Sequence, residues 1–176
     1  MLKIFKLLSR KNTSTLLLYF LEHPTGKTYA RQLRKEIQLS GVSILGGLRA
    51  LLEAGILEVE EIGRVRRYEL KRNEPVVKQL KVLLTINKVT PLLGKFRGSG
   101  VEVYLYGSAA RGEDTEKSDI DIFIQGNETD VPTETLEKLI KRKINLMFET
   151  DICKLPNELK NNLANGIVLQ GYFKVL

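Results

Sequence analysis

Apolar side chains in the first part of the chain recur at the three- and four-residue spacing of amphipathic helices. The apolar run at residues 16–21 predicts a first helix, with N-cap candidates at residues 12–15 and an end at residues 23–26. Residues 28–37 predict a second helix, and residues 39–41 predict a turn. A third helix, ending at Gly55, is predicted by apolar side chains four, seven and eight positions apart, namely Ile44, Leu48, Leu51 and Leu52.

Two further runs, residues 56–61 and 65–70, are rich in β-forming side chains and flank Ile62-Gly63-Arg64. This pattern is a strong hairpin signal. Helix, helix, turn, helix and a two-stranded wing is the order of a winged helix-turn-helix. Residues 1–73 are therefore predicted to form a domain of that kind.

Residues 12–72 also resemble the winged helix-turn-helix family in detail. Residues 29–33 match the pattern of its second helix, and residues 48–57 match the end of its recognition helix and the start of its wing. The resemblance implies that the third helix enters the major groove of DNA while the wing contacts the backbone or the minor groove. The implied phosphate contacts are Arg31, Arg34, Lys35, Arg64, Arg66 and Arg67, and the candidate base contacts are Ser40, Ser43 and Arg49. A winged helix that serves dimerisation or protein docking is the alternative.

Two adjacent glycines, Gly46 and Gly47, stand midway along the predicted recognition helix, where each costs ~1 kcal/mol relative to alanine. Within that helix, only Arg49 could make a bidentate contact with guanine. We therefore expect most of the DNA affinity to come from phosphate charge, with modest sequence discrimination.

The pattern changes after residues 73–75, where Pro75 suits the first turn of a helix. An amphipathic stretch then predicts a helical connector over residues 74–97, kinked at Pro91, which could equally be a dimer seam. Beyond it, strands are predicted at residues 101–106, from about residue 118, and at residues 143–148, with helices at residues 134–143 and 156–165. This alternation predicts a mixed sheet with helices mainly on one face over residues 98–176. The whole chain is expected to be of the α+β or α/β class, with a helix-rich winged helix domain first.

A glycine turn and two carboxylates follow the first of these strands. Gly107 lets the backbone approach a ligand closely and, with Ser108, can present successive N–H groups to an anion. Asp119 and Asp121 are expected to share one face of the next strand, because side chains alternate along a strand. Two neighbouring carboxylates repel unless a cation lies between them, and Mg²⁺ bound together with substrate phosphates fits that arrangement. The pattern therefore predicts a site for a metal and a nucleoside triphosphate.

The joint spacing resembles the nucleotidyltransferase superfamily that includes DNA polymerase beta, and most closely its minimal nucleotidyltransferase branch. The matching motif is Gly107-Ser108, Arg111-Gly112 and Ser118-Asp119-x-Asp121, and the resemblance covers roughly residues 78–176. It implies that Gly107 and Ser108 hold the β- and γ-phosphates, with Arg111 and Ser118 also counted as nucleotide-binding. Asp119 and Asp121 are implied to be catalytic and to hold Mg²⁺ or Mn²⁺.

One position departs from the family's pattern. The family uses a third carboxylate, second in a short apolar strand, to bring a second metal to the attacking hydroxyl. Asn145 occupies the matching position, and an asparagine carries no charge and cannot act as a base. Glu149 is ~13 Å further along an extended strand, too far to share a metal pair whose ions lie about 3.5–4 Å apart. Asp151 is further still, and Glu113 and Asp114 in the preceding loop stay as candidates. We therefore predict nucleotide and metal binding and leave turnover open.

Charge is unevenly divided along the 176 residues. Residues 1–90 carry 17 Lys+Arg and 8 Asp+Glu, net +9, and residues 91–176 carry 11 and 13, net −2, within an overall charge of +7. A basic first half favours nucleic acid as a partner, and a lysine-rich solvated surface is the alternative. A single cysteine and a single histidine, Cys153 and His23, exclude an intrachain disulfide, zinc sites and Ser-His-Asp chemistry. The apolar runs are too short for a signal-peptide core or a membrane span, so a cytoplasmic protein is expected.

Three functions stay open on this basis. The first is an enzyme that transfers a nucleoside monophosphate, AMP from ATP, to a hydroxyl of a small molecule or of a protein Tyr, Ser or Thr, as in the toxin–antitoxin pairs of this family. The second is a DNA-binding transcriptional regulator whose nucleotidyltransferase-like domain senses a nucleotide without catalysis. The third is an interaction protein in which both domains dock partners. The sequence leaves the oligomeric state open, a homodimer included.

Overall fold

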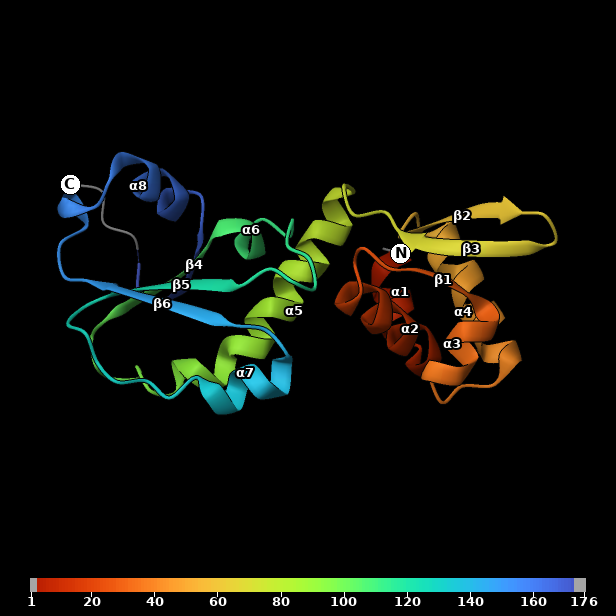
Figure 1. Cartoon of the computed structure of the whole chain (residues 1–176), viewed down its shortest axis with the longest axis horizontal. Helices are drawn as coiled ribbons and strands as arrows, with labels where there is room; N and C mark the ends of the chain where they lie inside the picture. Colours follow the sequence, from red (N-terminus) through yellow and green to blue (C-terminus); the bar gives the residue numbers. More distant parts are fainter. Residues whose placement is uncertain (1–2, 173–176) are drawn as a thin grey trace. The chain divides into compact units, whose positions relative to one another are not determined.

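The computed structural model describes residues 3–172 and divides the chain into two compact units, Met1–Val77 and Lys78–Leu176 (Figure 1). Each unit has its own sheet and its own set of buried apolar side chains. Within the described residues, no helix is both long enough and apolar enough to cross a membrane.

The first unit combines helices with a three-stranded antiparallel sheet. Its elements are α1 (Lys3–Leu8), α2 (Lys11–Glu22), β1 (Lys27–Tyr29), α3 (Ala30–Glu36), α4 (Gly41–Glu53), β2 (Leu57–Ile62) and β3 (Val65–Leu70). The strands lie in the order β1-β3-β2. The hairpin turns between the paired Ile62 and Val65, where Gly63 has a φ of 60° that glycine adopts at little cost. The helix order and the hairpin expected of a winged helix are thus present.

The start of α2 differs from the expected one. The helix begins at Lys11 after an N-cap at Arg10, so residues 12–15 lie within its first turns and the prediction that they cap it is wrong. The Thr15 hydroxyl donates a hydrogen bond to the Lys11 carbonyl one turn earlier, at 2.9 Å. The side chain thus bonds to the backbone within the helix and does not cap its start.

The start of the second predicted helix is also wrong. Thr28 and Tyr29 belong to β1, and α3 begins one residue later at Ala30. β1 pairs with β3, with Thr28 opposite Tyr68. The backbone of this short segment therefore takes its hydrogen bonds from a strand forty residues away in sequence, which overrides its helical pattern.

The second unit is a four-stranded mixed sheet with helices on both faces. Its elements are α5 (Pro75–Leu93, whose first residues precede the unit boundary), β4 (Glu102–Tyr106), α6 (Gly107–Ala110), β5 (Ile120–Gln125), α7 (Glu134–Ile140), β6 (Ile144–Glu149), a 3₁₀ turn (Ile152–Lys154), α8 (Asn157–Ala164) and β7 (Ile167–Gln170). The strands lie in the order β6-β5-β4-β7. β5 and β6 are parallel, and β4 is antiparallel to both β5 and β7. The predicted α+β class is confirmed.

Strand alternation gives the two faces of this sheet different roles. The isoleucines of β5, Ile120, Ile122 and Ile124, are buried in the larger core with Val89 and Leu92 of α5. The opposite face carries a smaller cluster of Tyr104, Phe123, Leu155 and Leu163. Figure 1 shows α5 and α7 on one side of the sheet and α8 on the other. Asp121 has the parity of Phe123, so it lies on the same face as this smaller cluster.

The helix expected as a connector is part of the second unit's core. Val89 and Leu92 of α5 are almost fully buried, and Phe96 just beyond the helix joins the same cluster. Pro91 lies in the last turn, two residues before α5 ends at Leu93. The helix thus packs against the sheet and places Lys78 and Lys81 near the loop that follows α6.

Candidate functional site

The glycine turn at the end of β4 meets two constraints that only glycine satisfies. Gly107 has a φ of 73°, a left-handed conformation that costs an L-residue with a side chain roughly 1–2 kcal/mol. A Cβ at this position would lie 2.7 Å from Asp121 Oδ2. The backbone of the turn therefore lies close to Asp121, one of the two predicted metal ligands.

Asp119, Asp121 and Asn145 come together at the ends of two parallel strands. Asp121 of β5 is in register with Asn145 of β6. Asn145 Nδ2 donates to Asp121 Oδ1 at 3.0 Å and reaches Asp119 Oδ2 at 3.4 Å. The amide thus lies between the two carboxylates and partly offsets their mutual repulsion.

The same three residues differ in how much solvent they meet. Asp119 and Asn145 are exposed, whereas Asp121 is half-buried. Tyr106 lies directly opposite Asp121 in the β4–β5 pair. Burial raises the pKa of the Tyr106 hydroxyl, and the nearby Asp121 charge raises it further, so the phenol stays neutral at physiological pH. Asp119 is accordingly accessible from solvent, and Asp121 lies beside a neutral tyrosine.

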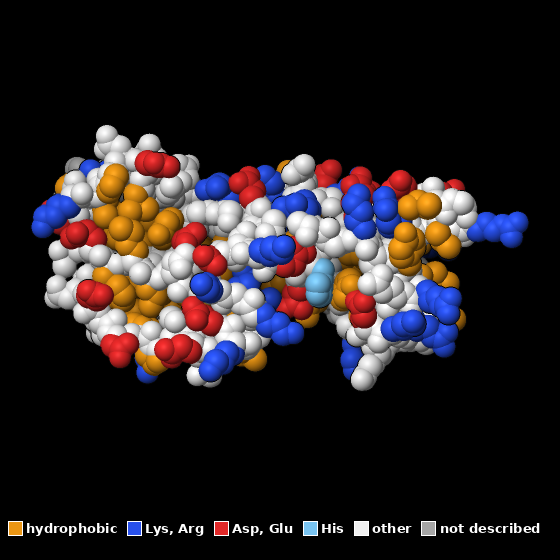
Figure 2. Space-filling view, viewed as in Figure 1, with side chains coloured by type: hydrophobic (Ala, Val, Ile, Leu, Met, Phe, Trp, Pro, Cys, Tyr) orange, Lys and Arg blue, Asp and Glu red, His pale blue; other side chains and the backbone are white. Residues whose placement is uncertain are grey.

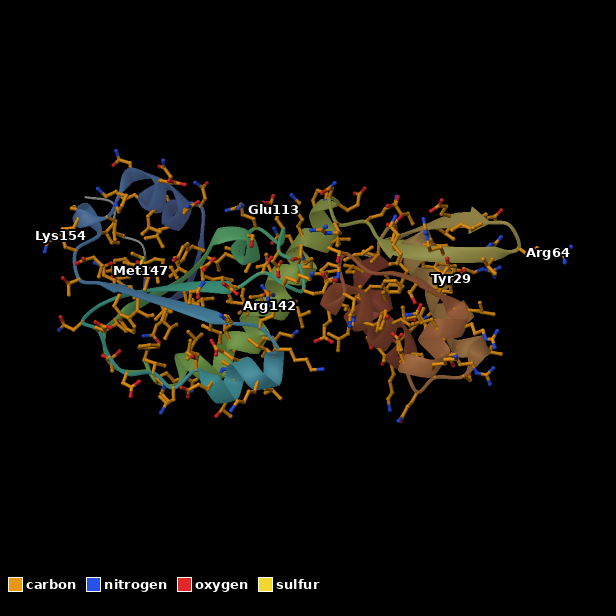
Figure 3. The ribbon with its side chains drawn as sticks, in the orientation of Figure 1. Tyr29, Arg64, Glu113, Arg142, Met147 and Lys154 are labelled. Carbon is orange, nitrogen blue, oxygen red and sulfur yellow. The ribbon has the colours of Figure 1, made fainter. Side chains whose placement is uncertain are left out.

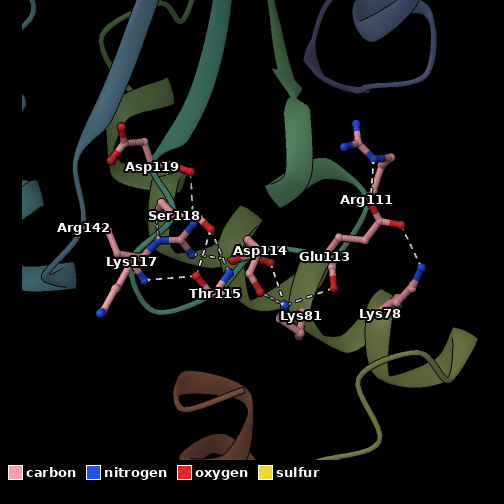
Figure 4. Close-up of polar contacts among 11 residues, drawn as sticks. Lys78, Lys81, Arg111, Glu113, Asp114, Thr115, Lys117, Ser118, Asp119 and Arg142 are labelled. Atoms are coloured by element: carbon pink, nitrogen blue, oxygen red, sulfur yellow. Dashed lines mark hydrogen bonds and ion pairs between the residues drawn. The ribbon is translucent and has the colours of Figure 1, made fainter. Parts of the chain in front are cut away.

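A buried ion cluster anchors the loop between the turn and the second strand (Figure 4). Asp114 is 4% exposed and Lys81 of α5 is 3% exposed, with their charged atoms 2.9 Å apart. Arg142 Nη1 donates to the other oxygen of Asp114 at 2.6 Å. Lys81 also donates to the carbonyls of Gly112 and of Asp114 itself. One carboxylate thus holds two cations from segments that lie far apart in sequence.

Arg142 connects this cluster to the predicted metal ligands. Its Nε donates to the Ser118 carbonyl at 2.7 Å, and its Nη2 donates to the Asp119 carbonyl at 3.2 Å. The guanidinium therefore fixes the backbone on which the Asp119 side chain stands. Figure 3 shows Arg142 near the start of β6.

A second ion pair system holds the residue before Asp114. Glu113 accepts from Lys78 Nζ at 2.8 Å and from Arg111 Nε at 2.9 Å. These hydrogen bonds lower the pKa of the Glu113 carboxyl to about 2. Glu113 and Asp114, considered as substitutes for a third metal ligand, are thus both engaged by cations. Arg111, predicted to steady the loop or the phosphates, lies within this loop and pairs with it.

The serines of the predicted motif have structural partners in the loop. The Ser118 hydroxyl accepts from the Thr115 backbone N–H at 2.9 Å and lies 3.1 Å from the Thr115 hydroxyl, which closes the turn before β5. The Ser108 carbonyl accepts from the Glu113 N–H at 2.9 Å. Ser108 is half-buried at the start of α6, where backbone N–H groups have no partner within the helix.

The remaining acidic candidates lie elsewhere. Glu149 is opposite Gln125, at the far end of β6 from Asn145. It accepts from the N–H groups of Thr150 and Asp151, which lower the pKa of its carboxyl. Among residues 3–172, no cluster of three or more His, Cys, Asp and Glu side chains is arranged to bind a metal ion. The acidic side chains next to Asn145 are Asp119 and Asp121.

Sequence reasoning missed the roles of Lys81 and Arg142. A signal for Lys81 does exist, because Val77, Lys81, Thr85 and Val89 follow one another at four-residue steps and all are buried. A lysine on the buried stripe of a helix requires a buried partner. Arg142 follows α7 and carries no comparable local signal.

The basic residues among the predicted DNA contacts of the first unit fall into three groups. Arg31, Arg34 and Lys35 of α3 and Arg49 of α4 are exposed, and Figure 2 shows Lys and Arg side chains gathered over the region of α3 and α4. Arg64 extends from the tip of the hairpin (Figure 3). The other wing arginines pair with acidic residues of β2, with Arg66 2.9 Å from Glu61 and Arg67 2.5 Å from Glu60.

Ser40 is the N-cap of α4, and Ser43 in the first turn is its hydrogen-bond partner. The Ser40 hydroxyl accepts from the Ser43 N–H at 3.2 Å and donates to the Ser43 hydroxyl at 3.0 Å. Asn12 of α2 donates to the same Ser43 hydroxyl at 3.0 Å. Two of the three predicted base contacts, the serines, thus stabilise the start of the helix in the unbound protein.

Comparison with known proteins bears on the second unit. The family model described as "Nucleotidyltransferase domain" matches residues 86–169. A protein of Methanocaldococcus jannaschii named "Putative protein adenylyltransferase" is 40% identical over 58 residues, covering 28% of this chain and 58% of that protein. The chain thus spans little more than half the length of this relative.

One solved structure, an ArsR-like transcriptional regulator from Rhodococcus sp. RHA1, aligns over 55% of this chain and 78% of its own. It is 21% identical with a TM-score of 0.35, too low to support a conclusion about fold or function. The two nucleotidyltransferase similarities support nucleoside monophosphate transfer in general. Residues 86–169, which contain the Gly107 turn, both aspartates and Asn145, match the nucleotidyltransferase domain family.

Proposed function

We propose that the second unit transfers a nucleoside monophosphate from a nucleoside triphosphate, with ATP as the donor and Mg²⁺ as the metal, to a hydroxyl acceptor. One observation carries this proposal. Asp119 and Asp121 both lie within hydrogen-bonding distance of a single amide, Asn145 Nδ2, and Asp121 lies beside the Gly107 turn. A phosphate-binding turn next to paired carboxylates is the arrangement that such a reaction needs.

The donor set fits a hard divalent cation. Mg²⁺ takes oxygen ligands and is usually bound by one or two carboxylates together with substrate phosphates. Asp119 and Asp121 supply the carboxylates, and rotation of the Asn145 amide would present its oxygen in place of its nitrogen. Bound Mg²⁺ would neutralise charge on the triphosphate as the leaving group departs.

The chain's own residues have distinct roles in this reaction. The backbone of Gly107 and Ser108 would bind the phosphates, with the aspartates positioned by β5 and by Arg142. The acceptor oxygen would form a bond to the α-phosphorus while the bond to the bridging oxygen breaks and pyrophosphate leaves. Asn145 cannot take the acceptor's proton, so an aspartate carboxylate or water must. We expect turnover to be slower than with three carboxylates.

A nucleotide-sensing regulator is the second candidate, and a specific observation favours it. Asn145 places a neutral donor where the family's pattern has a charged ligand, and its hydrogen bonds satisfy both aspartates without a second metal. In this form the first unit binds DNA through α3, α4 and the hairpin tip, and the nucleotide modulates that binding. The exposed cations of α3 and α4 support DNA as the partner in both candidates.

Labelled ATP separates the two candidates. The protein is incubated with Mg²⁺ and either α- or γ-labelled ATP, in the presence of Tyr-, Ser- and Thr-containing proteins and small hydroxyl compounds. Transfer of the α-label alone, lost in Asp119→Ala and kept in the exposed control Asp130→Ala, supports the enzyme. Nucleotide binding without transfer, converted to transfer by Asn145→Asp, supports the sensor. If no nucleotide binds at any Mg²⁺ concentration, both candidates fail.

A further inference from the structure

The adjacent glycines of α4 occupy two different environments. Gly47 is buried, and a Cβ there would lie 2.4 Å from Leu16 Cδ1 of α2. Close packing of α2 against α4 therefore explains Gly47. Gly46 is exposed, and a Cβ there would meet nothing within 4 Å. Glycine weakens a helix interior, and no contact within the first unit accounts for its presence at position 46.

Gly46 lies on an exposed stripe that has no partner in the unit. Val42, Leu45, Gly46 and Arg49 follow the i, i+3, i+4, i+7 spacing of one helical face. Val42 is 85% exposed and Leu45 is 58% exposed. The opposite face, with Ile44, Gly47, Leu48 and Leu51, is buried in the unit. We call the four exposed residues the α4 stripe.

Charge around the α4 stripe indicates what covers it. Arg49 lies on the stripe, and α3, which packs against α4, carries exposed Arg31, Arg34 and Lys35. Figure 2 shows these helices under a cluster of basic side chains. An apolar strip bordered by cations suits a polyanion that also offers apolar groups. The major groove of DNA does so, because each thymine presents its C5-methyl group there between the two phosphate backbones.

We propose that the α4 stripe reads thymine methyl groups in the major groove, with Gly46 at the closest approach of helix and base pairs. Val42 and Leu45 contact the methyl groups, and the absence of a side chain at position 46 lets the helix sit deeper in the groove. Arg49 and the α3 cations contact phosphates or guanine at the border. The inference rests on the proposed DNA binding of the first unit and adds a preference for A·T-rich sites. Glu53, exposed one turn beyond Arg49, sets the end of the contact by repelling phosphate.

Replacement of thymine by deoxyuracil tests the proposal, since it removes the methyl group and leaves the charge and the hydrogen-bonding pattern unchanged. Affinity of the full chain is measured for matched A·T, A·U and G·C duplexes over a range of salt concentrations. We expect binding to the A·T duplex to be about fourfold tighter than to the A·U duplex for each methyl group buried. The salt dependence should be the same for both duplexes.

Variants of the α4 stripe separate side-chain contact from differences between the duplexes themselves. Leu45→Ala should reduce the A·T over A·U preference, whereas Leu18→Ala, which truncates a 44% exposed leucine of α2, should keep it. Gly46→Ala should raise the Tm, because alanine favours the helix, and should weaken binding to the A·T duplex several-fold. Loss of affinity in a more stable protein would assign Gly46 to the contact.

Several outcomes would overturn the proposal. Salt-dependent binding with equal affinity for A·T and A·U duplexes would leave DNA binding in place and remove methyl recognition. A Gly46→Ala variant with a raised Tm and an unchanged affinity for DNA would show that Gly46 does not lie at the closest approach of the helix and the base pairs. Self-association of the wild type that Leu45→Ala abolishes, without any methyl preference, would assign the stripe to a second copy of the chain. Absence of salt-dependent binding to any duplex would end the DNA-binding role itself.

Discussion

Asn145 donates a hydrogen bond from its side-chain amide to Asp121 across two parallel strands in register, at 3.0 Å. A carboxylate at position 145 would bring a third negative charge to the same place. The amide instead supplies a donor, so the two aspartates can stand together at the strand ends without a cation between them. The three side chains therefore form a hydrogen-bonded cluster, which in the proposed function would bind one metal ion together with the nucleotide.

Asn145→Asp should make the folded state depend on divalent cations. Without Mg²⁺, the loss of a donor and the added charge should lower the free energy of unfolding by about 1–2 kcal/mol. Added Mg²⁺ should restore it and raise the Tm of the variant more than that of the wild type. Thermal unfolding across a Mg²⁺ titration measures both effects. An identical Mg²⁺ response of the two proteins would contradict the placement of residue 145 among the metal ligands.

Gly107→Ala should disrupt the site through its contact with Asp121. The added methyl group meets Asp121 Oδ2 at 2.7 Å, so turn and carboxylate must move apart. Gly100→Ala is the matched control, because Gly100 shares the positive φ, at 73°, but has open space around its Cβ position. Both variants should lose about 1–2 kcal/mol of stability.

Only Gly107→Ala should also weaken the binding of ATP in the presence of Mg²⁺. Each 1.4 kcal/mol of binding free energy that is lost as the turn and the carboxylate move apart weakens the affinity about tenfold. Titration calorimetry on the two variants makes the comparison. Equal ATP affinities in Gly107→Ala and Gly100→Ala would show that the turn does not contact the nucleotide site.

The buried ion cluster should contribute more to the free energy of unfolding than an exposed charge does. Asp114→Asn leaves the buried Lys81 and Arg142 without their shared anion, which we expect to cost about 3 kcal/mol in urea unfolding. Asp130→Asn, at an exposed aspartate, should change stability by less than about 0.5 kcal/mol. If Asp114→Asn unfolds at the same urea concentration as Asp130→Asn, the cluster does not anchor the loop.

The sequence predicted the geometry of the site where it depends on local periodicity. The alternation of residues along one strand placed Asp119 and Asp121 on a shared face, and the family's pattern pointed to Asn145. The sequence could not reveal that Arg142 fixes the Asp119 backbone, because the two residues are 23 positions apart and no repeat connects them. Lys81 lies 33 residues from Asp114, and only the buried stripe of its helix hints at the pairing.

The first unit shows the same division between local and distant causes. Helical spacing of the apolar residues predicted α4 and its buried face, and the turn at Gly63 predicted the hairpin. β1 was mistaken for the start of a helix because its strand character comes from pairing with β3, which no local pattern contains. The first turn of α2 was missed because polar residues fill it and apolar spacing begins only at Leu16.

Acid should remove the contribution of Glu113 to stability. Hydrogen bonds from Lys78 and Arg111 hold the pKa of this carboxyl at about 2, below its ordinary value of 4.5. A depressed folded-state pKa stabilises the protein above the unfolded-state value, and this contribution is lost as pH falls from about 4.5 toward 2. The Tm difference between wild type and Glu113→Gln should be constant above pH 5 and shrink below pH 4.5. The exposed control Glu128→Gln should show no such pH-dependent difference, and a Glu113→Gln difference that persists unchanged to pH 2.5 would rule the pairing out.

Binding of ATP with and without the metal tests the central claim most directly. Titration calorimetry is run with the wild type, Asp119→Ala and the exposed control Asp130→Ala, in Mg²⁺ and again in EDTA. We predict that the wild type and Asp130→Ala bind ATP in Mg²⁺ and lose most of that affinity in EDTA, whereas Asp119→Ala binds weakly in both. Equal ATP affinity of the wild type and Asp119→Ala in Mg²⁺ would contradict a metal–triphosphate site at the Gly107 turn.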